Sequence, residues 1–249
     1  MTTHLSIVTG GSRGLGLALV EQLLARGHRV LAIARRITEL PVPAGAALES
    51  WTVDLADPLP VAERLAGWLA AQDPAALASV TLVHNAGVVS PPAPLSASHP
   101  AALSNALRVG LEAPLVLSAS FLHATEAWAV PRKLLFISSG LGRRAMAGSG
   151  SYCAAKAGMD HLARALALEE AAKPAGARVV SLAPGVIDTD MQVQLRAADP
   201  TLFPERVRFQ SLKDNGQLDS PAQAAAKVLK VMDRDDFGSL PVTDVRELA

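Results

Sequence analysis

The residue types best suited to moving a proton lie close together in the second half of the chain. Tyr152, the only tyrosine, stands four residues before Lys156 in an alanine-rich run, and this spacing places both side chains on one face of a predicted helix. A phenol has a reference pKa of about 10, but a neighbouring ammonium favours the phenolate and lowers that pKa. Ser139 ends an apolar run upstream, and its hydroxyl can bond the oxygen that receives the proton. The three residues predict acid–base chemistry, although a tyrosine–lysine pair alone is also typical of an ordinary half-exposed helix face.

A second stretch with chemical meaning is glycine-rich and lies near the amino end. Thr9-Gly10-Gly11-Ser12-Arg13-Gly14-Leu15-Gly16 separates an apolar run from a helix-like run that begins at Leu17. A strand that turns directly into a helix leaves the first helical N–H groups unpaired, and these groups together with the helix dipole attract a pyrophosphate. Glycines allow the close approach of phosphates and the tight turn. The stretch predicts a nucleotide site, but such a turn can also serve chain geometry alone.

The elements that must position these residues are short apolar runs separated by stretches of helical period. This alternation predicts an α/β fold, a Rossmann-like doubly wound parallel sheet of about seven strands in a single domain. A further helix is predicted near Ala222 to Met232. Ligands of such sheets bind beyond the carboxyl ends of the strands. The predicted strands are Leu5–Val8, Val30–Ala34, Trp51–Val53, Val80–Val83, Leu134–Ile137, Val179–Leu182 and Leu240–Val245.

Composition narrows the class of partner. The chain has 249 residues with 23 basic and 23 acidic side chains, so no overall field favours nucleic acid or an anionic membrane. No apolar run reaches the roughly 18 to 20 residues of a membrane span. The single cysteine, Cys153, excludes an internal disulfide and suits a cytoplasmic location, and the start of the chain carries no signal-peptide pattern. The six histidines have neither metal-ligand spacing nor a cysteine partner, so no metal is predicted.

Together these motifs resemble those of the short-chain dehydrogenase/reductase family in its single-domain form. The resemblance implies one NAD(P)-binding domain over residues 1–249, with Ser139, Tyr152 and Lys156 at the family's catalytic positions. It also implies that Asp54 faces the adenine and that Ile187 and Thr189 meet the nicotinamide carboxamide. The cofactor-binding residues implied in this way are Gly10, Ser12, Arg13, Gly14, Leu15, Gly16, Arg35, Asp54, Leu55, Asn85, Ala86, Gly87, Tyr152, Lys156, Pro184, Gly185, Ile187 and Thr189.

The end of the second predicted strand indicates which cofactor is preferred. An NAD-selective enzyme commonly places a carboxylate there to bind the ribose 2′-hydroxyl, whereas this chain has Ala34 followed by Arg35 and Arg36. Guanidinium groups, with Arg13 from the glycine turn, can bind a 2′-phosphate in bidentate fashion. We therefore expect NADP(H) rather than NAD(H). The alternative, a solvated corner, fits Arg36 better than Arg35.

One position departs from the family pattern. The family usually has an asparagine whose backbone carbonyl holds a water of the proton relay, and Gly110 stands at that place here. Glycine tolerates a local helix kink and still carries a carbonyl, so turnover is in more doubt than binding. Asn105, five residues earlier, is expected to face elsewhere. His84, where the family often has asparagine, is expected to be a hydrogen-bonded residue at a strand end.

Three segments are expected to wall a substrate pocket: Val88–Pro94, Gly140–Ser151 and a lid at about 188–216. The run Phe209–Pro221 resembles the corresponding part of sepiapterin and benzil reductase-type members of the family. We expect an NADPH-dependent reductase of a small, hydrophobic or aromatic ketone, diketone or aldehyde, acting as a homodimer or homotetramer. An oxidative alcohol dehydrogenase, or a catalytically weak NADP-binding regulator or scaffold, remains an alternative. The apolar lining is expected to include Leu141, Met146, Met191, Leu195 and Phe203.

Overall fold

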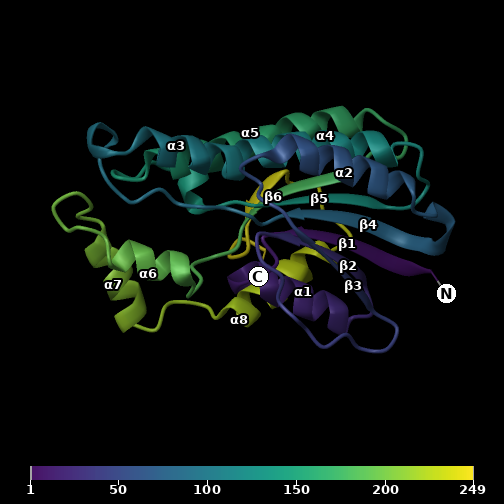
Figure 1. Ribbon diagram of the computed structural model, residues 1–249, viewed down its shortest axis with the longest axis horizontal. Helices are drawn as coiled ribbons and strands as arrows, with labels where there is room; N and C mark the ends of the chain where they lie inside the picture. Colours follow the sequence, from purple (N-terminus) through teal and green to yellow (C-terminus); the bar gives the residue numbers. More distant parts are fainter. Residues whose placement is uncertain (1, 249) are drawn as a thin grey trace.

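Seven parallel strands form one sheet in the computed structural model, which describes residues 2–248 (Figure 1). The spatial order is β3-β2-β1-β4-β5-β6-β7. The order reverses between β1 and β4, which is the point at which doubly wound sheets form a crevice. The predicted fold class is therefore confirmed. The strands are β1 Thr3–Thr9, β2 Arg29–Ala34, β3 Ala47–Thr52, β4 Leu77–His84, β5 Arg132–Ile137, β6 Arg178–Ala183 and β7 Val242–Asp244.

Helices cover both faces of the sheet, and two further helices lie beyond its carboxyl edge (Figure 1). α2, α4 and α5 pack on one face, and α1 and α8 pack on the other. Among the described helices, none is long and apolar enough to cross a bilayer. The α-helices are α1 Gly14–Ala25, α2 Pro58–Ala70, α3 Pro100–Leu107, α4 Ala113–Thr125, α5 Gly150–Ala171, α6 Asp190–Arg196, α7 Arg206–Asp214 and α8 Pro221–Met232, and the short 3-10 and π segments are η1 Pro74–Ala76, η2 Leu95–Ala97, η3 Arg108–Glu112 and η4 Gly140–Gly142.

The alternation of side chains along β2 shows why the sheet is covered twice. Leu31 and Ile33 join the core beneath α2, α4 and α5, whereas Val30 and Ala32 join the core beneath α1 and α8. Successive strand residues point to opposite faces, so a continuous apolar run needs a layer on each side. The same rule explains β1, β4, β5 and β6.

Two predicted boundaries are wrong for physical reasons. The third strand is β3, Ala47–Thr52, rather than Trp51–Val53. It lies at the edge of the sheet, where exposed and half-buried residues alternate and no apolar run marks the strand. The first helix begins at Gly14 rather than Leu17, because the last glycines of the turn already form its first helical residues.

The carboxyl ends of β1, β4, β5 and β6 all face the side where α6 and α7 lie (Figure 1). A small separate core joins these two helices to the loop before α5, and its buried members are Leu195, Phe203 and Phe209. Phe203 and Phe209 stack with ring centroids 5.8 Å apart. The predicted lid segment, 188–216, thus folds as two helices with a core of its own.

Candidate active site

A cavity of about 970 Å³ opens at this carboxyl edge. All three predicted wall segments line it, together with the glycine turn and the strand ends. Every predicted cofactor and catalytic residue borders this one cavity: Gly10, Ser12, Arg13, Gly14, Leu15, Gly16, Arg35, Asp54, Leu55, Asn85, Ala86, Gly87, Ser139, Tyr152, Lys156, Pro184, Gly185, Ile187 and Thr189.

The glycine turn has the geometry of an anion cradle. Gly10 and Gly14 have φ angles of 70° and 54°, which side chains rarely adopt. A Cβ on Gly16 would overlap the carbonyl oxygen of Gly10. No described side chain caps the start of α1, so its first N–H groups face the cavity edge unpaired. The turn therefore fits a dinucleotide pyrophosphate by backbone shape alone.

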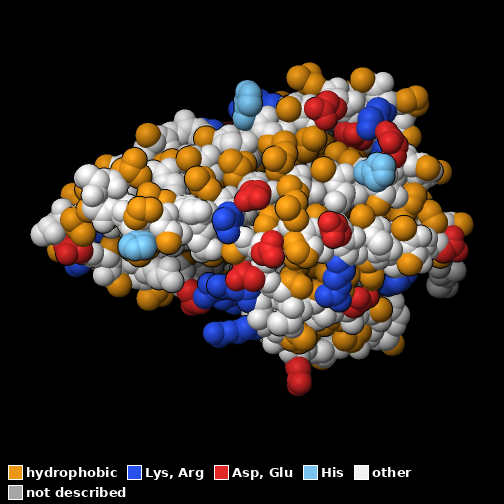
Figure 2. Space-filling model, turned by 45° about the horizontal axis from the view of Figure 1, so that its top comes forward, with side chains coloured by type: hydrophobic (Ala, Val, Ile, Leu, Met, Phe, Trp, Pro, Cys, Tyr) orange, Lys and Arg blue, Asp and Glu red, His pale blue; other side chains and the backbone are white. Residues whose placement is uncertain are grey.

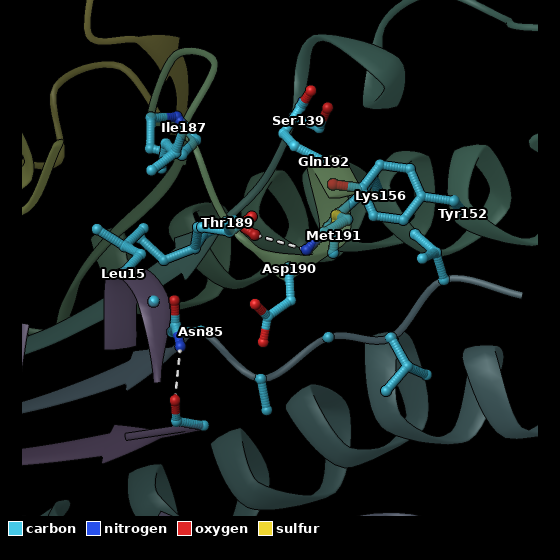
Figure 3. Close-up of a pocket in the computed structure, with 18 of the residues that line it drawn as sticks. Leu15, Asn85, Ser139, Tyr152, Lys156, Ile187, Thr189, Asp190, Met191 and Gln192 are labelled. Atoms are coloured by element: carbon cyan, nitrogen blue, oxygen red, sulfur yellow. Dashed lines mark hydrogen bonds between the residues drawn. The ribbon is translucent and has the colours of Figure 1, made fainter. Parts of the chain in front are cut away.

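Hydrogen bonds between β1 and β4 hold this cradle. Asn85 Nδ2 donates to the carbonyls of Thr9 and Gly10 at 3.0 and 3.3 Å, and Figure 3 shows a hydrogen bond of Asn85 drawn as a dashed line. The Thr9 hydroxyl oxygen accepts the amides of Asn85 and Ala86, both at 3.0 Å. The last residue of β1 and the residue that follows β4 thus hold the ends of the two strands together beside the glycine turn.

The arginines divide into two groups. Arg35 and Arg36 follow β2, line the cavity and are exposed, and neither pairs with a carboxylate among residues 2–248. Arg13 instead donates to Asp190 on α6 at 2.8 Å, so it joins the glycine turn to the lid segment. Two guanidinium groups are therefore available at the end of β2 for a phosphate, while a third already has a partner.

The opposite wall of the cradle is the segment after β6. Gly185 has a φ angle of 87°, and Ile187 pairs in a single parallel bridge with Asp219. A Cβ on Gly14 would lie 3.3 Å from Thr189 Cγ2, so the glycine turn and the start of α6 approach closely. This wall fits the flat end of a nicotinamide that reaches past the turn.

Ser139, Tyr152 and Lys156 lie at one end of the cavity, and Leu15 and Asn85 lie at the other (Figure 3). Ser139 Oγ accepts the amide of Leu141 at 3.2 Å, which leaves the serine hydrogen free to be donated. Lys156 Nζ is buried, donates to the carbonyl of Ile137 at 2.6 Å and lies 5.7 Å from the centre of the Tyr152 ring. The helix pair predicted from the spacing thus meets the serine at the end of β5.

The pKa directions differ from the expectation. Burial raises the pKa of Tyr152 above its ordinary value, and a side-chain hydrogen bond with Ser139 opposes that rise. Burial also lowers the pKa of Lys156 to about 8, against a raising effect of Asp160. The lysine therefore sits near the pH at which it can exchange a proton.

Asn105 borders the cavity together with Val109, because both lie on one face of the helix that leads into η3. One expectation about the lining is wrong, since Phe203 is not among the residues that border the cavity. Phe203 is fully buried within the small lid core, since Gly148 leaves it room: a Cβ there would lie 2.8 Å from its ring. Asp244 and Arg246 line the cavity from outside every predicted wall segment. The predicted wall segments also contribute lining residues that were not singled out individually, namely Arg144, Gln192, Arg208, Phe209 and Leu212.

The Gly110 position is a π-turn. η3, Arg108–Glu112, joins α3 to α4, and a Cβ on Gly110 would lie 3.1 Å from Ala155 Cβ on α5. The helical path is therefore irregular at Gly110, and glycine lets this segment pack against the helix of Tyr152. His84 is buried and hydrogen-bonded to Ser118 at 2.8 Å, as expected. Burial lowers the pKa of His84 to about 3, so its ring is neutral.

Comparisons with known proteins agree with this geometry. A family model described as short chain dehydrogenase matches residues 5–200. A benzil reductase ((S)-benzoin forming) of Bacillus cereus is 32% identical over 93% of this chain and 94% of its own length. A sepiapterin reductase of Meriones unguiculatus is 32% identical over 94% of this chain and 92% of its own length. A crystal structure of a short-chain dehydrogenase/reductase from Burkholderia vietnamiensis is 36% identical, covers 98% of both chains and has a TM-score of 0.65.

Proposed function

This chain belongs to the short-chain dehydrogenase family, and from that premise we propose that it is an NADPH-dependent reductase of small carbonyl compounds. The family acts on carbonyl and alcohol groups with a nicotinamide cofactor. The observation that carries the proposal is that Ser139, Tyr152 and Lys156 border the same cavity as the glycine cradle. A proton donor and a hydride donor can thus reach one substrate.

The preference for NADPH rests on the end of β2. Arg35 and Arg36 line the cavity there and have no acidic partner among the described residues, and a 2′-phosphate would give these two cations a counter-charge. Asp54, after β3, would face the adenine. Its Oδ1 already accepts the amide of Ala56 at 3.0 Å, which fixes the carboxylate.

NADPH, when bound, supplies a hydride to the carbonyl carbon. Tyr152 donates the proton that the carbonyl oxygen needs, and Ser139 donates a hydrogen bond to that oxygen and holds it beside the phenol. Lys156 stabilises the phenolate left behind and returns a proton to it. Its pKa of about 8 suits this transfer, because the ammonium is present at neutral pH and yields its proton readily.

The substrate class follows from the walls beyond Tyr152. Met146, Met191, Leu195 and Phe209 give them an apolar surface, which suits an aromatic or aliphatic body. The Bacillus cereus relative is named for the reduction of benzil, an aromatic diketone. We therefore propose hydrophobic or aromatic ketones, diketones and aldehydes as substrates.

A two-part experiment tests this function. Titration of NADPH fluorescence measures cofactor binding, and NADPH absorbance measures turnover with benzil, other diketones, aromatic ketones and aldehydes. The parent should bind NADPH and oxidise it with at least one member of the panel. Tyr152→Phe should retain NADPH binding and lose on the order of 10² to 10⁴ in turnover.

Two outcomes contradict the proposal. Equal turnover by Tyr152→Phe would remove the tyrosine from the reaction. If the protein binds NADPH and reduces no carbonyl but oxidises alcohols with NADP⁺, it is an oxidative enzyme. If it binds NADPH and neither carbonyls nor alcohols react, it is a regulatory binder.

We propose in addition a cytoplasmic homodimer or homotetramer. Leu115 on α4 and Leu168 on α5 are 48% and 77% exposed, and Figure 2 shows hydrophobic side chains spread over the helical side that is turned forward. Burial of such side chains against a second copy stabilises an assembly. Sedimentation of the parent and of Leu168→Glu measures the oligomeric state, and a monomeric parent would contradict the proposed assembly.

A further inference from the structure

The strongest feature that the proposed function leaves unused is a buried carboxylate on the catalytic helix. Asp160 stands four residues after Lys156 on α5, so Tyr152, Lys156 and Asp160 follow one face of the helix at successive turns. Its side chain is 1% exposed. An ionised carboxylate in such a place is costly unless other groups compensate for its lost hydration.

One oxygen of Asp160 holds two neighbouring strands. The hydroxyls of Ser138 and Ser181 both donate to Oδ1 at 2.6 Å. Ser138 directly precedes Ser139 at the end of β5, and Ser181 lies in β6. The strand end that carries Ser139 is thereby tied to the helix that carries Tyr152 and Lys156.

The other oxygen faces the loop that follows Ser139. Arg143 Nε lies 3.4 Å from Oδ2, and Arg143 Nη2 donates to the carbonyl of Thr243 on β7 at 2.7 Å. Gly142 makes this approach possible, because a Cβ there would lie 2.6 Å from Oδ2 and 2.9 Å from the carbonyl oxygen of Lys156. The loop from Gly140 to Arg144, which borders the cavity, is thus fixed against the same carboxylate.

The charges around Asp160 come from three elements. Lys156 lies one turn earlier on α5, and Arg143 approaches from the loop after η4. Asp244 on β7 is a second carboxylate that interacts electrostatically with Arg143. Ser138 and Ser181 contribute neutral donors. Asp160 favours the charged form of Lys156, and burial disfavours it. Removal of the carboxylate should therefore make the lysine easier to deprotonate.

We propose that Asp160 is a positioning residue for the reduction: it fixes Ser139 relative to Tyr152 and Lys156, and its negative charge keeps Lys156 protonated. This inference rests on the proposed function for its kinetic consequence. Its electrostatic part concerns Lys156 itself and can be measured without turnover.

The informative variant is Asp160→Asn, which keeps the size of the side chain and an oxygen that can accept from both serines, but removes the charge. The pKa of Lys156 is read from the ¹³C signal of the lysine ε-carbon, assigned with Lys156→Met. We expect that pKa to fall by about one unit, the low end of what an opposite charge contributes. The fall in kcat on the alkaline side should move to lower pH by a similar amount, with kcat reduced about fivefold at pH 8, where the protonated fraction of Lys156 falls from about one half to about one tenth, and KM little changed.

Two further variants separate charge from packing. Ser181→Ala removes one hydrogen bond to Oδ1 but no charge, so it should lower thermal stability without moving the pKa of Lys156. Arg143→Gln removes the cation beside Asp160, which leaves the carboxylate charge uncompensated, so it should move the pKa of Lys156 upward, opposite to Asp160→Asn. If Asp160→Asn does not fold, the opposite shift in Arg143→Gln still tests the charge effect.

An unchanged lysine pKa in Asp160→Asn, or an unchanged or lowered one in Arg143→Gln, would overturn the proposal and leave Asp160 with a structural role only. A parent that turns over no carbonyl, with the lysine shifts as expected, would overturn the proposed function and not the electrostatic role of Asp160.

Discussion

The end of the cavity at the glycine turn is built mainly from backbone, whereas the end beyond Tyr152 is built mainly from side chains. At the first end, Gly10, Gly14 and Gly16 admit a ligand because they lack side chains, and Thr9 with Asn85 braces the turn. At the second end, the side chains of Met191 and Phe209 from the lid border the cavity, and Arg246 from beyond β7 also lines it. Shape at the first end is set by local chain geometry, and shape at the second is set by how distant segments pack.

This difference decides how much of the site could be predicted. Glycines, arginines and the tyrosine–lysine pair occupy fixed spacings along short stretches, so their place beside one cavity follows from the order of the strands. The fold follows in the same way, because five of its strands are plain apolar runs. The edge strand β3 was misplaced since it is only half buried.

The sequence indicates less clearly which residues form the substrate end of the cavity. Phe203 and Phe209 are six residues apart, equally apolar and both members of the lid core, yet only Phe209 also borders the cavity. Their roles depend on how α6 and α7 pack on the loop before α5, which no local pattern shows. Asp160 was missed for a related reason: its serine partners lie on two strands, and each is an ordinary strand residue by sequence.

The largest expected effect belongs to the backbone end. Gly16→Ala would place a methyl group against the carbonyl oxygen of Gly10, which is backbone and cannot move aside. We expect NADPH binding to be lost and the free energy of unfolding to fall. Fluorescence titration and urea unfolding measure the two effects.

Gly67→Ala is the matched control for that change. Gly67 lies within α2, and a Cβ there has open space around it, so alanine should stabilise the helix by about 0.5 to 1 kcal/mol with NADPH binding unchanged. Normal NADPH binding by Gly16→Ala would contradict the view that backbone shape sets this end.

The next effect concerns the core of the lid. Phe203 is fully buried, and Phe203→Ala should cost about 3 to 5 kcal/mol of packing. Because that core is separate from the two sheet cores, the loss should appear as faster hydrogen exchange in residues 188–216 and a raised KM for carbonyl substrates. Val207→Ala, at a side chain that is 70% exposed, should change neither, and a uniform loss over the whole chain would show that the lid is not a separate unit.

A smaller effect is expected from the side chains that border the cavity at its end beside the glycine turn. Arg35→Ala removes a cation that borders the cavity after β2, and a charge-assisted bond to phosphate is worth about 1.5 to 3 kcal/mol. The Kd for NADPH should rise roughly ten- to hundredfold, while the Kd for NADH stays nearly constant. Parallel losses for both cofactors would mean that Arg35 does not distinguish them.

The smallest effect is expected from single side chains of the substrate wall, because that wall is shared among several segments. Met191 is half-buried at the start of α6 and borders the cavity. Met191→Ala should raise KM for a bulky aromatic diketone by about tenfold, change KM for a small aliphatic ketone much less, and leave the Kd for NADPH unaltered. Val193→Ala on the same helix, at a side chain that is 54% exposed, provides the control. A weaker affinity for NADPH in Met191→Ala would mean that the two ends of the cavity are coupled through α6, since Arg13 of the glycine turn already bonds to Asp190 beside it.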